Sequence, residues 1–584
     1  MSAAHAAGAA ATTTGEAATV HAAFAATAEA RPRAPFLRVL DSVAARYGVP
    51  AGDLSYGEAA ARVDRLRAAL ATAGYGHGHR VALLLENRPA FFLAWLALNA
   101  LGCSVVPINA DLRAAELEYL FGHAEPELAV SIASHAPRLR EAAAASGAAT
   151  PVIDVDVLET LAIDGTGEPR ILPSARHGAP ATGAPGRDTE CGLLYTSGTT
   201  GRPKGCVLPN DYYLLAGRWY AGIGGMAALR PGEDVLITPL PMVHMNAMAY
   251  STMAMIATGG CVVPLDRFHP SGWWSDVRAA RATVVHYLGV MPAMLLAAEP
   301  SPTDRAHSVR FGFGAGVDPR QHGAFETRFG FPLLEAWAMT ETGAGAVVIA
   351  HREPRKVGTA CFGAPLPEVE TRIVLDAGGV AGVDQPGELW VRAQGADPRR
   401  GFFREYLKDP QATAEAWEGG WFHTGDLVRR DADGQLHFVD RKKNVIRRSG
   451  ENIAAVEVES VLRRHPEVRD VAVAATPDPV RGDEVLACVV LRDPADAGTA
   501  PLGAGALEDV AARRARVARE LVALCLEQLA YYKAPGWVAF VDALPLTASQ
   551  KVSRGELKAL AQRLPGDPGC LDQRHLKKRT GHGR

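Results

Sequence analysis

The chain has 584 residues, of which 48% are hydrophobic, and its 61 Lys and Arg nearly balance its 64 Asp and Glu. A chain of this length needs more than one hydrophobic core, so a single small domain is excluded. The formal charge of -3 gives no sign of a nucleic-acid or anionic-membrane partner. Eight scattered cysteines form neither a disulfide pattern nor a zinc cluster, which favours a reducing compartment and predicts a cytoplasmic protein.

The N-terminal segment is rich in Ala and Thr and lacks the basic and apolar regions of a signal peptide. We therefore expect residues 1–35 to be disordered. The most apolar stretch, FFLAWLALNALGCSVVPI from Phe91, is interrupted by Asn99, Gly102 and Ser104. A buried helix followed by a strand explains it better than a membrane span, so we expect no transmembrane segment.

Residues 36–441 alternate short β-rich runs with longer helical patterns of Ala, Leu and Arg. The runs are RVALLL, DVLITPL, GGCVVPL, ATVVHYL and GELWVRA. This alternation predicts an α/β fold with mostly parallel, helix-covered sheets in one large multi-sheet N-terminal domain. Residues 163–187 are rich in Gly, Pro, Ala and Thr and are expected to form an exposed linker.

The pattern restarts over residues 442–562, which predict a small α+β C-terminal domain. Its expected elements are a helix at AAVEVESVLRRHP, strands at VRDVAVAATP and EVLACVVL, a helix over about 507–529 and a strand at GWVAFVDALP. Residues 563–584 end in HLKKRTGHGR, which we expect to be a solvated basic tail.

The stretch LLYTSGTTGRPKG, residues 193–205, combines hydroxyl groups, exposed glycine backbone and cations, all of which suit phosphate oxygens. Its spacing is not that of a Walker P-loop, in which Lys and a hydroxyl directly follow the second Gly. The alternative is a flexible surface loop. As a phosphate-binding loop, its candidate residues are Thr196, Ser197, Gly198, Thr199, Thr200, Gly201 and Lys204.

Four further residues have side chains that suit a nucleotide. In LLEAWAMTETG, residues 333–343, Trp337 can stack on a purine, Thr340 can bond a phosphate and Glu341 can hold Mg²⁺. Asp426 in WFHTGDL can accept ribose hydroxyls, although a turn before a strand would explain the same residues.

Two cations complete the set. Arg441 in VDRKKNVIRRSGENI is a second candidate for ribose or phosphate, and Lys551 in PLTASQKVSR lies on an expected loop. Most lysines are solvated surface residues, which is the alternative for Lys551.

Together, in this order and over residues 36–562, these motifs resemble the adenylate-forming superfamily of acyl- and aryl-CoA synthetases, firefly-type luciferases and peptide-synthetase adenylation domains. RRSGENIAAVEVE, DPQATAEAW and RFGFPLLEAWAMTET bring the chain nearest to the carnitine/crotonobetaine–CoA ligase-like branch. Two motifs depart from the family pattern. Trp337 and Ala338 stand where the family has Tyr and Gly, and Gln550 stands where it has Gly before the terminal lysine, Lys551.

The resemblance implies an ATP-dependent acid–CoA ligase. A carboxylate attacks the α-phosphorus of ATP, pyrophosphate leaves, and the CoA thiol then displaces AMP from the acyl-adenylate. Mg²⁺ is expected on Glu341 and Thr196, Thr340 and Lys551 near the reacting phosphate, and the 193–205 loop on the β- and γ-phosphates. Further contacts to nucleotide or acyl group are implied for Gly314, Ala315, Gly316, Glu335, Ala336 and Met339.

The resemblance also implies a mobile C-terminal domain that rotates between the two half-reactions about Lys443. The loop Ser449, Gly450, Glu451 and Asn452 then lines the pantetheine tunnel. His244 in PLPMVHMNAM corresponds to the family's gate between this tunnel and the acyl pocket, and Met245 and Asn246 are expected in that pocket. The alternative for His244 is a purely structural role.

The carnitine-type members of the branch carry an acidic residue two places after the gate histidine, where this chain has Asn246. A buried fixed cation needs a carboxylate or an aromatic cage, so we expect an uncharged acyl tail. The expected partners are a carboxylic acid, ATP and CoA, with a homodimer as the suggested assembly. Three alternatives stay open: an enzyme loading a carrier protein, a luciferase-like oxidase and an inactive nucleotide-binding relative.

Overall fold

The computed structural model describes residues 17–163, 172–196, 202–441, 445–492, 510–545 and 552–578. The chain divides into two compact units. The first, called the N-terminal unit, comprises Met1–Ala110, Leu120–Tyr195 and Gly205–Asp440. The second, called the C-terminal unit, comprises Asp111–Tyr119, Thr196–Lys204 and Arg441–Arg584.

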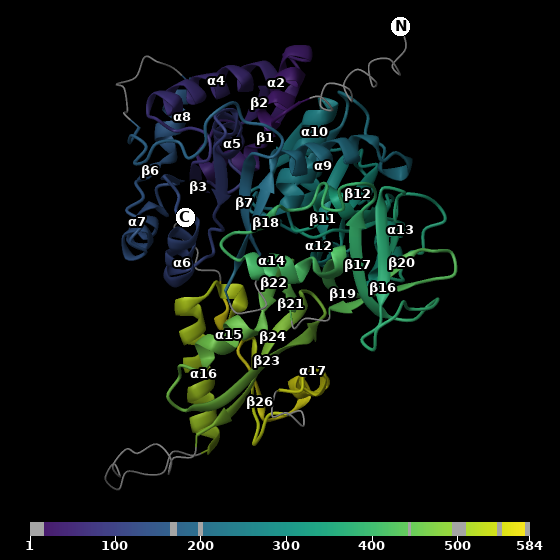
Figure 1. Cartoon of the computed structure of the whole chain (residues 1–584). Coiled ribbons are helices and arrows are strands. Elements are labelled where there is room, and N and C mark those ends of the chain that lie inside the picture. Colours follow the sequence, from purple (N-terminus) through teal and green to yellow (C-terminus); the bar gives the residue numbers. More distant parts are fainter. Residues whose placement is uncertain are drawn as a thin grey trace. The chain divides into compact units, whose positions relative to one another are not determined.

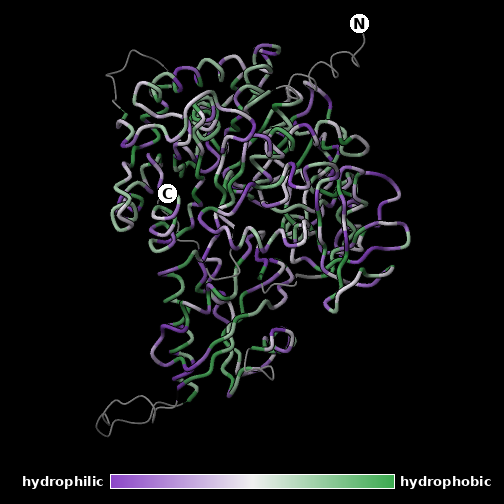
Figure 2. The backbone as a smooth tube through the Cα atoms, viewed as in Figure 1, coloured by the Kyte–Doolittle hydropathy of each residue, from purple (hydrophilic) through white to green (hydrophobic). Residues whose placement is uncertain are grey.

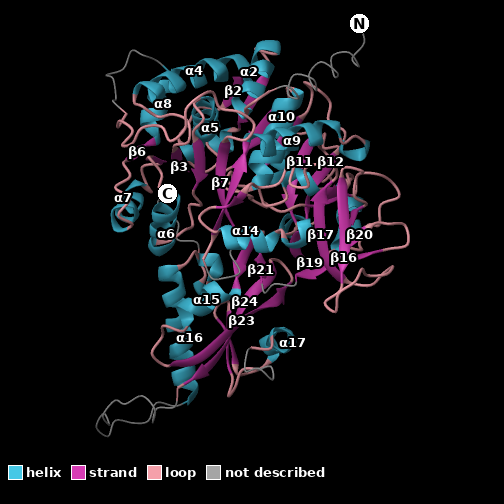
Figure 3. Cartoon of the chain, in the orientation of Figure 1, coloured by secondary structure: helices cyan, strands magenta, loops and turns pink. Residues whose placement is uncertain are grey.

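The largest sheet of the N-terminal unit has eight strands, and its six inner strands pair in parallel (Figures 1 and 3). In spatial order they are β14 (Val348–Ile349), β13 (Leu333–Trp337), β12 (Phe311–Ala315), β11 (Val284–Leu288), β9 (Val235–Thr238), β10 (Cys261–Pro264), β1 (Pro35–Val39) and β2 (Gly52–Ser55). Both outer strands are antiparallel. Parallel neighbours bring the carboxyl ends of β12 and β13 to one edge.

A second sheet has seven strands, with parallel pairing through its centre. Its order is β18 (Glu405–Tyr406), β8 (Lys204–Pro209), β7 (Glu190–Thr196), β4 (Ser104–Pro107), β3 (Arg80–Leu84), β5 (Leu128–Ser131) and β6 (Val152–Asp154). Strands β4 and β5 are buried along their whole length, as expected for parallel strands covered on both faces. The predicted multi-sheet α/β architecture is confirmed.

A third sheet of five strands corrects one part of that prediction. It contains β15 (Cys361–Gly363), β20 (Leu436–Arg441), β19 (Phe422–Arg430), β17 (Gly387–Ala393) and β16 (Val369–Val374). GELWVRA forms β17, which pairs antiparallel with both of its neighbours. Its burial alternates residue by residue, the pattern of a sheet with one solvated face, so this sheet is an exception to the mostly parallel arrangement that the sequence predicts.

Helices connect and cover these strands. In chain order they are α2 (Val20–Ala30), α3 (Asp41–Tyr47), α4 (Tyr56–Thr72), α5 (Pro89–Ala100), α6 (Ala114–Ala124), α7 (Ala136–Ala145), α8 (Val155–Ile163), α9 (Asn210–Gly222), α10 (Met253–Thr258), α11 (Trp273–Ala280), α12 (Val290–Leu296), α13 (Pro319–Phe329) and α14 (Pro410–Ala416). Helix α5 is apolar on all sides and buried from Ala90 to Asn99, so the expected buried helix before strand β4 is confirmed. Residues 172–189 form no helix or strand.

The expected disorder of residues 1–35 was wrong from residue 17 onward; residues 1–16 lie outside the described part. Helix α2 buries Val20 and Phe24 in the N-terminal unit, and Thr19 caps its first turn. Two backbone N–H groups in its first turn donate to buried asparagine side chains. The Oδ1 of Asn210 accepts from Val20 at 3.0 Å, and the Oδ1 of Asn99 accepts from His21 at 2.8 Å. Tertiary partners therefore order a segment whose composition alone suggests disorder.

The C-terminal unit is a sheet packed on both faces. Its order is β22 (Glu451–Ala454), β21 (Val445–Arg448), β24 (Gly482–Leu491), β25 (Trp537–Phe540) and β26 (Cys570–Asp572), with β23 (Val468–Asp478) also paired to β24. Alternate residues of β23 and β24 face two separate apolar clusters. One contains α15 (Ala455–Leu462) and α16 (Val510–Gln528), the other α17 (Arg554–Arg563). Strands β23 and β24 appear as hydrophobic stretches in Figure 2.

The predicted helices and strands of 442–562 are therefore confirmed where they are described, whereas the solvated tail was wrong for residues 563–578. Strand β26 extends the sheet by pairing with β25. Lys577 is 7% exposed and its ammonium donates to Glu484. The run of cations looked solvated because its buried carboxylate partner lies 93 residues away in sequence.

Within the described residues, no helix is both long and apolar enough to cross a membrane.

The ordered helix α2 generates a stability prediction. Phe24 is fully buried, with ring centroids 5.1 Å from Phe36 and 5.9 Å from Tyr56. Phe24→Ala should lower the free energy of unfolding of the N-terminal unit by about 3–5 kcal/mol, because the cavity lies in a packed aromatic cluster. Urea unfolding measures this, with exposed Glu29→Ala on the same helix as the control. Equal stabilities of the two variants would mean that α2 is not docked.

Candidate active site

The aromatic ring and the carboxylate predicted for the nucleoside are directly hydrogen-bonded. Trp337 ends strand β13, and its indole N–H donates to Oδ2 of Asp426 on β19 at 2.8 Å. Trp337 is 6% exposed and Asp426 1%, and the indole also lies against Phe362. The tryptophan that replaces the family's tyrosine thus supplies an uncharged donor that fixes the orientation of the carboxylate.

Glu341, the predicted metal ligand, is held in the same way. It is buried, and its Oε1 accepts a hydrogen bond from the Tyr406 hydroxyl at 3.0 Å. Its backbone carbonyl accepts from the amide of Phe403. The backbone carbonyl of neighbouring Thr340 accepts from the Tyr212 hydroxyl at 3.0 Å. Burial, followed by the nearby Glu341 charge, raises the pKa of Tyr406 strongly, so this hydroxyl keeps its proton and acts as a donor.

The glycine-rich end of β12 is shaped by close backbone approach. A methyl group at Gly314 would lie 2.3 Å from the carbonyl oxygen of Tyr287, so no larger residue fits. Gly316 has a φ of 81°, in the left-handed region. Ala315 is the last residue of the strand between them.

Glu335 supports this glycine-rich end from the next strand. Its buried carboxylate accepts from the Tyr287 hydroxyl at 2.7 Å and from the backbone amides of Gly316 at 2.9 Å and Val317 at 3.3 Å. Burial raises its pKa, against these bonds. The contacts of Glu335 are therefore made within the protein, and its predicted contact with nucleotide, like that of neighbouring Ala336, stays a prediction.

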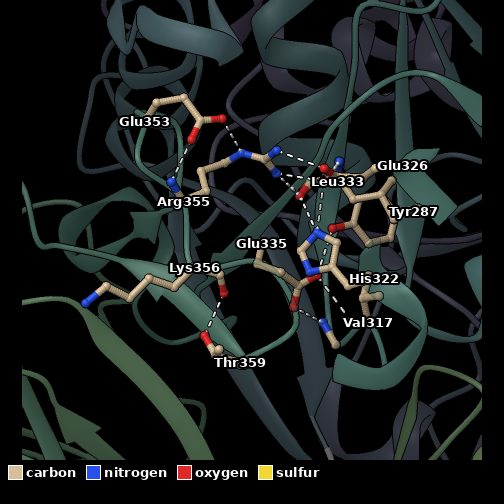
Figure 4. Close-up of polar contacts among 11 residues, drawn as sticks. Tyr287, Val317, His322, Glu326, Leu333, Glu335, Glu353, Arg355, Lys356 and Thr359 are labelled. Carbon is tan, nitrogen blue, oxygen red and sulfur yellow. Dashed lines mark hydrogen bonds and ion pairs between the residues drawn. The ribbon is translucent and has the colours of Figure 1, made fainter. Parts of the chain in front are cut away.

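Sequence reasoning missed the ion network behind Glu335, which Figure 4 shows. Arg355 binds both oxygens of Glu326, at 2.7 and 2.9 Å, and Glu326 accepts from the amide of Leu333 at 2.9 Å. His322 bridges Glu326 and the Leu333 carbonyl at 3.1 Å each. Although burial opposes it, hydrogen bonds from Arg355 and His322 lower the pKa of Glu326 to about 2. The residues of this ion network are too far apart in the sequence to form a motif.

The segment with the predicted gate forms a π-helix, Asn246–Thr252, that runs into α10. His244, Met245 and Asn246 are all half-buried, and a π-helix is often found at a functional site. Asn246 does not act alone, because its Oδ1 lies 2.7 Å from Nδ1 of His286. Met339, also predicted for the acyl pocket, donates its amide to Thr342 at 2.9 Å.

His286 is a second residue that the sequence reasoning missed. It is fully buried on β11 and stacks on Phe313, while Tyr220 donates to its Nε2 at 3.1 Å. Burial lowers its pKa to about 3, so the imidazole is neutral and its Nδ1–H can donate to Asn246. A polar residue within the apolar run VVHYL was the only available signal.

The predicted CoA loop is a tight hairpin turn in the C-terminal unit. Ser449 and Gly450 both have positive φ, 50° and 88°, between β21 and β22, as in a two-residue type I′ turn. The Ser449 amide donates to the carbonyl of Arg481 at 2.9 Å. Glu451 and Asn452 begin β22.

The remaining predicted residues lie at the limits of the described part. Thr196 ends β7, Lys204 begins β8, and Arg441 ends β20 with only its backbone described. Outside the described residues lie Ser197, Gly198, Thr199, Thr200, Gly201, Lys443 and Lys551. The roles of all these residues stay predictions.

Two family models match most of the chain. Residues 24–407 match the AMP-binding enzyme family, and residues 457–551 match the AMP-binding enzyme C-terminal domain. The chain belongs to the family of AMP-binding enzymes. A crotonobetaine/carnitine–CoA ligase of Salmonella paratyphi A is 30% identical over 509 residues, which are 86% of this chain and 93% of that protein. A corresponding ligase of Salmonella typhi is 31% identical over 491 residues, covering 83% and 89%.

Solved structures agree with this assignment. The o-succinylbenzoate CoA synthetase of Bacillus subtilis, bound to a product analogue, has a TM-score of 0.72 at 25% identity and covers 92% of this chain and 98% of its own. A malonyl-CoA ligase with methylmalonyl-CoA and AMP has a TM-score of 0.66 at 29% identity, covering 88% and 96%. The prediction of an AMP-forming acid–CoA ligase that uses ATP and CoA is confirmed at the level of the enzyme class.

The neutral, buried His286 generates a pH prediction. Its pKa is about 3 in the folded protein and about 6.5 in an unfolded chain, so the unfolded state binds more protons between these values. The contribution of neutral His286 to the free energy of unfolding is fully present above about pH 6.5 and is lost as pH falls towards 3. Lowering pH from 7.5 to 5.5 should therefore cost about 1.4 kcal/mol through this residue.

Urea unfolding at both pH values tests this contribution. His286→Gln should be less stable than the parent at pH 7.5, because it disturbs the stacked network, yet lose less stability on acidification. His575→Gln, which removes an exposed histidine, is the control for the substitution itself. An unaltered pH dependence in His286→Gln would show that another group dominates.

Proposed function

We propose that this enzyme activates a carboxylic acid with an uncharged acyl tail and transfers it to CoA. The observation that supports nucleotide binding is a pair of buried carboxylates, Asp426 and Glu341. Each accepts a hydrogen bond from an uncharged donor that orients it. A buried carboxylate is a strong acceptor for ribose hydroxyls and a suitable ligand for a metal ion. The family assignment supplies the reaction in which both would be used.

In the first half-reaction, Asp426 accepts hydrogen bonds from the ribose hydroxyls while Trp337 keeps the carboxylate in place. Gly314 lets β12 lie against Tyr287 without a side chain between them, and the base and the acyl group are proposed to bind beside this strand end. The acid's carboxylate attacks the α-phosphorus and pyrophosphate leaves, with Thr340 and Lys551 stabilising the charge on the phosphoryl oxygens. The 193–205 stretch is proposed to hold the β- and γ-phosphates.

Glu341 fits the Mg²⁺ that the family implies, because it is a buried carboxylate next to the proposed phosphate site. Mg²⁺ is commonly held by one or two protein carboxylates together with water and substrate phosphates. In line with this mode, the described residues contain no group of three or more His, Cys, Asp or Glu placed to hold a metal ion. Thr196 is the second proposed ligand. When bound, the ion neutralises phosphate charge.

In the second half-reaction, the C-terminal unit rotates about Lys443 and presents residues 449–452 to the pantetheine arm of CoA. The thiol displaces AMP from the acyl-adenylate through the gate at His244. We propose the cytoplasm as the compartment, because the eight cysteines are all free thiols and buried.

The acyl tail is proposed to be uncharged although the two curated relatives above are named for crotonobetaine and carnitine. Asn246 is neutral and its amide oxygen is bonded to neutral His286, so neither residue offsets a fixed cation. Met245 beside it is a flexible apolar contact. We propose an aliphatic or alicyclic acid.

The proposal is tested by measuring pyrophosphate release from a panel of carboxylic acids, with and without CoA. We expect acid-dependent release and a CoA thioester as the product. Turnover that needs a carrier protein in place of CoA, or that forms hydrogen peroxide without CoA, would favour the loading enzyme or the oxidase. Absence of adenylation with every acid would favour an inactive relative.

Removal of the proposed catalytic lysine should separate the two half-reactions. Lys551→Ala should slow adenylate formation by at least about 100-fold, as expected for loss of a charged donor to the developing negative charge. Thioester formation from a synthetic acyl-adenylate should stay close to that of the parent enzyme. Gln550→Ala, the neighbouring change, is the control. Equal losses in both half-reactions would contradict the role assigned to Lys551.

A charge change at residue 246 should redirect substrate choice. Asn246→Asp should raise kcat/KM for carnitine or crotonobetaine relative to neutral acids of similar length, by about tenfold or more if the new carboxylate lines the pocket. Asn246→Leu removes the amide without adding charge and should not favour the cationic acids. A parent enzyme that already prefers them would overturn the proposed acyl class.

A further inference from the structure

The strand that leads into the predicted CoA turn is anchored by a buried charge cluster. Arg448 immediately precedes the Ser449–Gly450 turn, and its guanidinium Nε donates to Oε2 of Glu484 at 2.9 Å. Arg448 is 3% exposed and Glu484 is fully buried. This ion pair fixes the side-chain direction of β21 at its last residue before the turn.

The other oxygen of the same carboxylate is held by the end of the chain. The ammonium of Lys577 donates to Oε1 of Glu484 and to the carbonyl of Tyr532, the latter at 3.3 Å. The amide of Val485 also donates to Oε1, at 2.8 Å. One carboxylate thus joins the strand before the turn to a lysine 129 positions further along the chain.

The fold makes room for this arrangement. A methyl group at Gly536 would lie 2.5 Å from the Glu484 carboxyl carbon, so glycine lets β25 pass beside the carboxylate. Strand β26 pairs with β25, and the Gln573 amide then donates to the Gly536 carbonyl at 2.8 Å, which brings residues 574–577 across the site. The segment after β26 is therefore built into the sheet.

Arg448 and Lys577 both bind the Glu484 carboxylate, so Lys577 can be removed without leaving that carboxylate unpaired. Burial, followed by the charge of Arg448, lowers the pKa of Lys577 to about 7. Removal of Lys577 leaves Glu484 and Arg448 as a one-to-one pair, so the unit should keep its fold. Removing one member of a buried ion pair is destabilising when it leaves the other charge unpaired, but Lys577→Met leaves Glu484 paired with Arg448.

We propose that Lys577 is a positioning residue for the CoA half-reaction, acting through Glu484 and Arg448 to hold the Ser449–Gly450 turn. This inference rests on the proposed role of residues 449–452 toward CoA. It assigns a function to the C-terminal segment beyond the last family-model match, which ends at residue 551.

The test compares Lys577→Met with Lys578→Met, a change of the exposed lysine next to it. Lys577→Met should raise KM for CoA by about fivefold or more, while KM for ATP and the rate of adenylation stay within twofold of the parent. Amide hydrogen exchange over residues 445–454 should become faster in Lys577→Met. Lys578→Met should match the parent in all of these measurements.

Every outcome is decisive for Lys577. An unchanged KM for CoA, or equal losses in both half-reactions, would overturn the positioning role, the latter because the residue would then support the fold alone. Faster exchange at 445–454 with no thioester formed by the parent from any acid would instead count against the proposed function. The two failures are therefore distinguishable.

Discussion

The candidate site depends on one buried carboxylate, that of Glu335. Strands β12 and β13 are parallel neighbours, so their ends lie side by side, but the chain leaves β12 through Gly316, a residue type with little conformational preference. Glu335 removes this freedom by accepting the amides of Gly316 and Val317. A carboxylate buried at this point must be satisfied by hydrogen bonds, so the fold and the shape of the site support each other.

The N-terminal unit contains carboxylates with two different kinds of hydrogen-bond donor. Both carboxylate oxygens of Glu326 accept hydrogen bonds from Arg355, so the negative charge of Glu326 is balanced within the protein. Glu341 and Asp426 accept hydrogen bonds from the uncharged donors Tyr406 and Trp337. The proposed function assigns these two carboxylates to metal and ribose.

The C-terminal unit contains a tight turn of defined backbone geometry. A two-residue hairpin turn fixes backbone geometry through Ser449 and Gly450, but the strands that lead into it also need an anchor. A buried ion pair provides direction rather than large net stability, because desolvation offsets much of its attraction. The position of Arg448 directly before the turn suits this purpose.

The sequence by itself determined the α/β class, the restart of the pattern near residue 442, the family and the nucleotide motifs, because periodicity and motif chemistry are local properties. It misjudged helix α2 and the segment with Lys577, whose order comes from partners distant in the chain: Asn210 for Val20 and Glu484 for Lys577. Only the tertiary structure decided that Asn246 is tied to His286 and that Trp337 is tied to Asp426. Such pairs join residues tens of positions apart, and the packing of separate strands, rather than any spacing in the sequence, brings them within hydrogen-bonding distance.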